Sequence, residues 1–180
     1  GGNSSIAGSG ITDVISTGGG GGGAGFVGGS GGGGNASTSG KAGTANQGYA
    51  GGDGDQTGIE FYGGGGGGGA GSAGTDVGTA AASNPGHGGK GLMSVASGEF
   101  VFYAGGGGGG NWARNETGYS GTAGTTSTGV LDTSSVPHSK TAYGQPIPNA
   151  PANRGGGGSS NYNVDGSNGG SGIVIIRYSL

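Results

Sequence analysis

Glycine occurs in unbroken runs along this chain, and these runs constrain its fold more than any other feature of the sequence. Glycine accounts for 58 of the 180 residues and forms five blocks, at 18–23, 31–34, 63–69, 105–110 and 155–158. Each glycine costs an α-helix about 1 kcal/mol, and glycine weakens the interior of a β-strand. The sequence therefore predicts almost no α-helix, and its glycine blocks require another ordered conformation.

The polyglycine II helix is the conformation that suits these blocks. It shares polyproline II geometry, with three residues per turn and no internal hydrogen bonds. Its N–H and C=O groups point outward, where they can pair with neighbouring helices, and only glycine lets the backbones come close enough. Tracts with glycine at every third residue, such as 118–124 and 166–172, fit the same packing. Collagen is excluded because the chain lacks a strict Gly-X-Y register and contains only five prolines.

Short stretches rich in β-branched and aromatic residues separate the blocks. These strand candidates are residues 11–16, 58–62, 92–104 and 173–178, and the third reads as a hairpin that turns at Ser97-Gly98. We expect one β-class domain over residues 1–180, in which a small antiparallel sheet or sandwich, including a tumour-necrosis-factor-like or jelly-roll form, carries an attached polyglycine II bundle. The expected core residues are Phe61, Phe100, Phe102, Ile173 and Ile175.

Composition and charge exclude several classes of protein. Hydrophobic residues make up 28% and charged residues 8% of the chain, against about 45–50% and about 25% in ordinary globular domains. The net charge is −3 with no basic patch, so we expect no nucleic-acid partner. The longest run of large apolar residues, 173–176, is far shorter than the roughly 20 residues that span a membrane, so we expect no membrane insertion. The start Gly1-Gly2-Asn3 suggests part of a longer protein.

Catalytic and metal-binding patterns are weak. Cysteine is absent, and the two histidines, His87 and His138, have no metal-ligand spacing around them. Glycine-rich matches to nucleotide-binding loops carry little information at this composition, because no helix follows them. The carboxylates are too scattered to predict a hydrolytic pair. We therefore expect no enzyme, no metal and no cofactor.

Aromatic residues outside the strand candidates form the candidate binding site. The residues that we assign to receptor binding are Tyr49, Trp112, Arg114, Tyr119 and Tyr143. Aromatic rings among adaptable polar neighbours suit the recognition of glycans or proteins. The alternative is structural: Trp112, close behind the block at 105–110, would plug the end of the bundle or lie in a subunit interface.

The chain resembles, over most of its length, the glycine-rich C-terminal domains of bacteriophage tail-fibre and related virion fibre proteins. The resemblance rests on Gly-Gly-Ser-Gly-Ile-Val-Ile-Ile-Arg-Tyr at 169–178 and on the aromatic-Ala-polyglycine segment that starts at Phe102. The chain is also similar in style to the distal adhesins of T-even-like phages, whose polyglycine II lattice displays variable recognition loops. It is similar as well to the glycine-rich domain of the anaplastic lymphoma kinase family, although that domain carries cysteines.

The resemblance implies an extracellular, virion-associated protein that binds a host-surface glycan or protein through loops between polyglycine helices. It also implies association with further copies of the chain, with a trimer as the expected fibre form, or with other virion proteins. The competing hypothesis is a purely structural module, such as a virion decoration, a collar or a filament subunit. That module would bury the aromatic residues between chains and would bind no soluble ligand.

Overall fold

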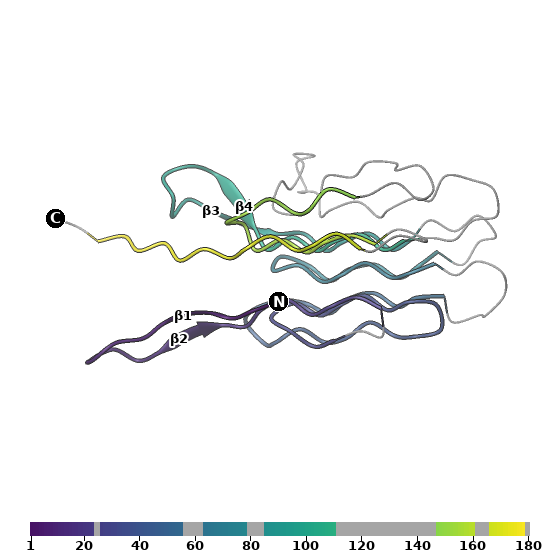
Figure 1. Cartoon of the computed structure of the whole chain (residues 1–180), viewed down its shortest axis with the longest axis horizontal. Coiled ribbons are helices and arrows are strands. Elements are labelled where there is room, and N and C mark those ends of the chain that lie inside the picture. Colours follow the sequence, from purple (N-terminus) through teal and green to yellow (C-terminus); the bar gives the residue numbers. More distant parts are fainter. Residues whose placement is uncertain (24–25, 56–62, 79–84, 111–146, 161–165, 179–180) are drawn as a thin grey trace.

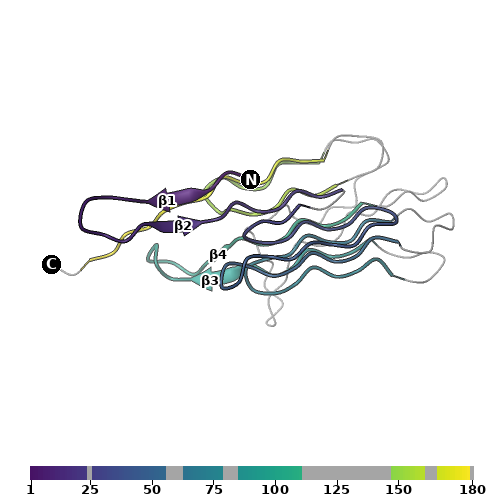
Figure 2. The same cartoon turned by 90° about the horizontal axis from the view of Figure 1, so that it is seen from below.

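A computed structural model of the chain describes residues 1–23, 26–55, 63–78, 85–110, 147–160 and 166–178. Within these ranges there is no α-helix, and regular strands are limited to β1 (Ser4–Ile6), β2 (Val14–Ser16), β3 (Leu92–Ser94) and β4 (Val101–Tyr103). The other described segments are extended and run side by side along the long axis of the molecule (Figures 1 and 2). The expected β-class fold with almost no α-helix is confirmed.

The strands form two separate antiparallel hairpins at one end of the molecule (Figure 1). In the first, Ser4 of β1 lies opposite Ser16 of β2, and in the second, Leu92 of β3 lies opposite Tyr103 of β4. The hairpin expected within 92–104 is therefore present. Its turn contains Gly98, whose φ of 92° lies in the left-handed region that favours glycine.

The expected small antiparallel sheet or sandwich is represented by two separate two-stranded sheets. The two hairpins do not join, and each described sheet has two strands. Strand β1 was not predicted, because Ser-Ser-Ile carries little strand propensity of its own and becomes a strand by pairing with β2. Residues 173–178 are extended but belong to no strand, and the candidate 58–62 lies outside the described residues.

The expected apolar core is also wrong. Phe100 is 77% exposed and Ile173 is 45% exposed, while Phe102 and Ile175 are half-buried. Phe61 lies outside the described residues. Among the residues that the structure describes, the buried hydrophobic side chains are those of Ile147 and Ala150. The reason is geometric: a two-stranded hairpin with strands of three residues has no second layer to cover its apolar face.

The bundle is held together by the backbone of one central segment, residues 63–71. Its successive N–H groups donate in three different directions, and each direction recurs every third residue. Positions 64, 67 and 70 donate to 104–110, positions 65 and 68 donate to 26–35, and positions 66 and 69 donate to 72–75. This period of three is the signature of a polyglycine II helix.

The carbonyl groups of the central segment follow the same period. Those of 63, 66 and 69 accept N–H groups from segment 47–55, and those of 64 and 67 accept from segment 85–91. The donor–acceptor distances of these bonds run from 2.7 to 3.0 Å, which is ordinary backbone geometry. Five neighbouring segments therefore surround the central segment and bond to it without any side chain.

Glycine is required in the central segment because the neighbouring backbones approach so closely. A Cβ added at position 65, 66, 68 or 69 would collide with a backbone carbonyl oxygen of an adjacent segment. Position 67 differs, because a Cβ there would lie 3.6 Å from the nitrogen and oxygen of Gly107, an ordinary contact. The chain itself places Ala70 one turn further along the same face.

The two ends of the bundle are different. Near one end, Gly64 donates to the carbonyl of Gly110 and accepts the N–H of Gly86, and Asp55 donates to the carbonyl of Gly63. These residues stand next to the points where the described ranges stop or resume. The opposite end carries the N–H of Ala70 bonded to the carbonyl of Ala104 at 2.8 Å, and from there the chain enters the hairpins.

Candidate functional site

Of the predicted binding residues, the structure describes Tyr49. Its side chain is 53% exposed, and its backbone N–H donates to the carbonyl of Gly69 at 3.0 Å. This bond places Tyr49 near the end of the bundle that carries the hairpins. Trp112, Arg114, Tyr119 and Tyr143 lie outside the described residues, so their assignment stays a prediction. They fall between Gly110, at the opposite end of the bundle, and Ile147.

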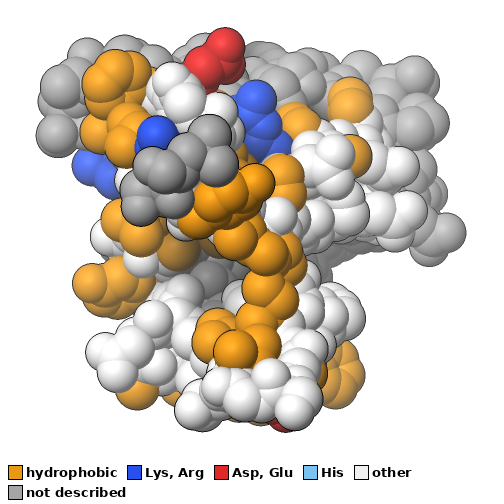
Figure 3. Space-filling view, turned by 90° about the vertical axis from the view of Figure 1, so that its left-hand side faces the viewer, with side chains coloured by type: hydrophobic (Ala, Val, Ile, Leu, Met, Phe, Trp, Pro, Cys, Tyr) orange, Lys and Arg blue, Asp and Glu red, His pale blue; other side chains and the backbone are white. Residues whose placement is uncertain are grey.

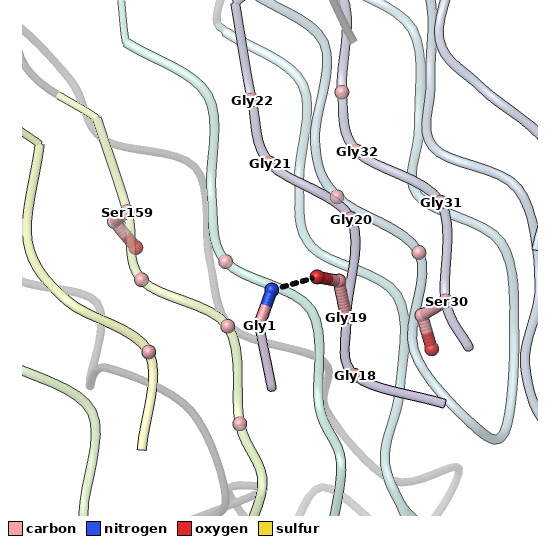
Figure 4. Close-up of a pocket in the computed structure, with 18 of the residues that line it drawn as sticks. Gly1, Gly18, Gly19, Gly20, Gly21, Gly22, Ser30, Gly31, Gly32 and Ser159 are labelled. Carbon is pink, nitrogen blue, oxygen red and sulfur yellow. Dashed lines mark hydrogen bonds between the residues drawn. The ribbon is translucent and has the colours of Figure 1, made fainter. Parts of the chain in front are cut away.

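A cleft of about 1040 Å³ runs along the bundle. One wall is formed by segments 17–23 and 29–35, and the other by segments 155–160 and 166–172. Residues of 64–68 and 104–110 also line it. In Figure 4, Gly1 stands between Gly19 on one side and Ser159 on the other.

The lining of the cleft is almost entirely backbone. Glycine predominates, with serine and a few amides such as Asn35, Gln47 and Asn168, and no Asp, Glu, His, Lys or Arg side chain belongs to the described lining. The nearest formal charge is the amino group of Gly1, which donates to the carbonyl of Gly19 at 2.6 Å. The cleft therefore offers hydrogen-bond donors and acceptors rather than acid–base groups.

A second surface, the apolar end, gathers large hydrophobic side chains on the two hairpins and on 173–178. Its members are each at least 45% exposed: Ile11, Val14, Ile15, Leu92, Met93, Val95, Phe100, Ile173, Val174, Ile176 and Tyr178. Figure 3 views this end and shows hydrophobic side chains spread across it. The Nη1 of Arg177 donates to the carbonyl of Val95 at 3.3 Å and ties the C-terminal segment to the second hairpin. Large exposed apolar patches are commonly found at protein–protein or membrane interaction sites.

Two of the described carboxylates accept hydrogen bonds from backbone N–H groups. Asp53 accepts the N–H of Gly40 at 2.9 Å, and Asp76 accepts the N–H of Asp53 at 2.7 Å. Both bonds satisfy backbone donors where neighbouring segments meet. His87 is exposed, with its backbone N–H bonded to the Thr75 hydroxyl at 2.7 Å, and His138 lies outside the described residues. No group of three or more metal-ligating side chains occurs within the described ranges.

Sequence reasoning missed two polar side chains that hold the structure together. The Oε1 of Gln47 accepts the N–H of Thr17 at 2.7 Å, and its Nε2 donates to the carbonyl of Ile15 at 3.3 Å. Ser159 is 4% exposed, and its Oγ accepts the N–H of Gly108 at 3.1 Å. Neither residue has a local signal, because both bonds join segments that are distant in sequence.

In the part of the chain that the structure describes, no helix has the length and apolar character needed to cross a membrane. In a comparison with protein families, a family described as "Glycine-rich domain" matches residues 1–179. No curated protein and no solved structure matches this chain significantly.

Proposed function

Since this chain belongs to the glycine-rich domain family, we propose that it is a non-enzymatic structural and host-recognition domain of a bacteriophage fibre. The observation that carries the proposal is the central segment 63–71, bonded through its backbone to five neighbours. Backbone hydrogen bonds hold such a bundle together without a side-chain core, so its side chains are available for binding at the two ends of the molecule. The resemblance of 169–178 to the ends of phage fibre proteins supplies the biological setting.

The two ends of the molecule suit two different tasks. The hairpin end exposes apolar side chains, which suits attachment to further copies of the chain or to another virion protein. The chain leaves the other end at Gly110 and returns at Ile147, and the intervening 36 positions contain Trp112, Arg114, Tyr119 and Tyr143. In the proposal these four residues bind a host-surface glycan or protein. Tyr49 lies near the hairpin end and has a minor role.

An adsorption competition assay tests the recognition role. Purified chain is added to candidate host cells, and both its binding and its protection of the cells against virus are scored. The proposal expects saturable binding that protects the cells, and it expects Trp112→Ala and Tyr119→Ala to abolish both. Tyr178→Ala is the matched control, because this exposed aromatic lies at the apolar end. If the folded protein binds to none of the hosts of the virus, the recognition role is refuted.

A purely structural role is the second candidate, and the apolar end favours it. Eleven large hydrophobic side chains are exposed there, from Ile11 to Tyr178 along the sequence. A fibre subunit that meets other copies through this end would need no receptor. Sedimentation analysis separates the cases: a stable oligomer that leaves adsorption unaffected supports the structural role alone.

A further inference from the structure

Among the described residues, the packing around the central segment 63–71 leaves one direction without a neighbour. A helix with three residues per turn points its N–H groups in three directions and its C=O groups in three others, which gives six possible neighbours. Five are present: 26–35, 47–55, 72–78, 85–91 and 104–110. The sixth direction is the one in which the carbonyls of Gly65 and Gly68 point, and both residues line the cleft.

The backbone groups that face this direction lack partners within the described residues. The carbonyls of Gly65 and Gly68 accept no N–H group there. On the flank formed by segment 29–35, the N–H groups of residues 29 and 35 donate to 17–23, and those of residues 31 and 34 donate to 47–55. The N–H of Gly33 is left to face the cleft. On the other flank the same period leaves the N–H of Gly107.

These four residues are all buried. Buried backbone groups in native proteins are nearly always paired, with protein or with water. Two carbonyls from the floor and one N–H from each flank form a pattern of acceptors and donors in the region where a sixth extended segment would lie. The cleft is therefore matched in chemistry to a peptide backbone.

The N-terminal residues show that an extended strand fits against this lining. Gly1 donates its amino group to the Gly19 carbonyl at 2.6 Å (Figure 4). Gly18 donates its N–H to the Oδ1 of Asn3 at 3.0 Å. The Gly1 carbonyl lies so close that a Cβ on Gly18 would collide with it. This is the spacing found throughout the bundle, and it occurs at one end of the cleft.

We propose that the cleft is a binding site for an extended glycine-rich strand supplied by another polypeptide, which adds to the bundle as the sixth neighbour of the central segment. The strand binds in polyglycine II conformation and pairs with Gly33, Gly65, Gly68 and Gly107. The bound strand needs glycine wherever it meets the walls of the cleft. Elsewhere in the bundle, a Cβ at this spacing collides with backbone carbonyl oxygens. Tyr49, the predicted receptor-binding residue that the structure describes, does not line this site.

Gly67 provides a way to close the site without damaging the fold. A Cβ at position 67 would have 3.6 Å contacts with Gly107 and a 3.9 Å contact with the carbonyl oxygen of Gly31, so it lies between the two flanks of the cleft. Gly67→Ala therefore keeps the fold but removes the room for a strand at bundle spacing. Gly8→Ala is the matched control, because its Cβ would make only ordinary contacts with the Ile11 side chain, away from the cleft.

The test is the binding of a labelled peptide to the full chain. The peptide copies residues 63–71, with lysines at both ends for solubility, and a control peptide has alanine in place of every glycine. Binding is followed by fluorescence anisotropy. Two lost backbone hydrogen bonds correspond to a decrease in affinity of about tenfold or more. We expect the glycine peptide to bind wild type and Gly8→Ala with equal affinity. We expect its affinity for Gly67→Ala to be lower by this factor or more.

Amide resonances give a second readout that does not depend on the variants. The glycine peptide should shift the Gly33 and Gly107 amides of the wild-type chain and slow their exchange with solvent, while the alanine peptide leaves them unchanged. The proposal is overturned if the glycine peptide fails to bind at its solubility limit. It is equally overturned if the alanine peptide binds as well, or if Gly67→Ala binds like wild type.

Discussion

The carbonyl oxygen of His87 lies where the Cβ of any side chain at position 66 would have to sit. The next residue along the chain, Gly67, meets no such obstacle. Adjacent glycines of one run therefore carry different constraints, and the difference follows from the three-residue period of the backbone. The cohesion of the bundle resides in these close approaches, which can be tested one position at a time.

Gly66→Ala and Gly67→Ala should have opposite effects on stability. The first forces two segments of the bundle apart, and overpacking of this kind costs about 1–3 kcal/mol. The second fits without strain and should raise the free energy of unfolding by about 0.4–1 kcal/mol, because alanine restricts the unfolded chain. Urea denaturation of the two variants beside wild type measures both effects. An equal decrease in the free energy of unfolding of both variants would contradict the difference that the structure shows between the two positions.

Ser159→Ala should destabilise the bundle, whereas Ser160→Ala should not. The hydroxyl of Ser159 is the acceptor for the buried N–H of Gly108, and an unpaired buried donor costs about 1–3 kcal/mol. Ser160 is exposed, and its hydroxyl makes no hydrogen bond within the described residues. Thermal melts of both variants make the comparison. A Ser159→Ala protein that melts with wild type would show that water replaces the hydroxyl without cost.

Gln47→Ala should loosen the first hairpin and leave the second unchanged. Its amide bonds to Thr17 and Ile15 connect β2 to the bundle, and each such bond contributes about 0.5–1.5 kcal/mol. Hydrogen exchange should speed up at Ile15 and Thr17. The amides of β3 and β4 serve as the internal control, since Gln47 does not contact them. Uniform acceleration in both hairpins would point to a global effect rather than to a lost anchor.

Phe100→Ser and Ile176→Ser should weaken association between copies of the chain. These side chains are 77% and 68% exposed at the apolar end. Burying such a side chain contributes about 1.5–3 kcal/mol, so each change should lower the association constant about tenfold or more. Val27→Ser is the control, because Val27 is 74% exposed but belongs neither to a hairpin nor to 173–178. Analytical ultracentrifugation measures the association constant of all three variants. Equal association constants would exclude the apolar end as the contact between copies.

The polyglycine bundle could be predicted from sequence because its cause is local. A run such as 63–69 excludes α-helix and core packing, and backbone pairing then remains as the source of order. The hairpin at 92–104 was predictable for the same reason, since its strand formers flank a glycine in the turn. Both inferences needed only residues that are adjacent in the sequence.

The failures have a common physical origin in tertiary arrangement. The β-branched run at 173–176 predicts a strand, but strand pairing needs a neighbour with free backbone groups, and none pairs with it among the described residues. Phe100 and Ile173 were expected in a core that the two separate hairpins do not form. The cleft was missed because the number of neighbours around 63–71 depends on how all the segments assemble.

The small apolar core has a thermodynamic consequence. The heat capacity change on unfolding comes mainly from apolar surface that becomes hydrated, and within the described residues few large apolar side chains are buried. Backbone exposure lowers that quantity further. The stability of this protein should therefore vary little with temperature, and cold should weaken it less than it weakens an ordinary globular domain. A domain built this way would stay folded in cold water as well as in warm water.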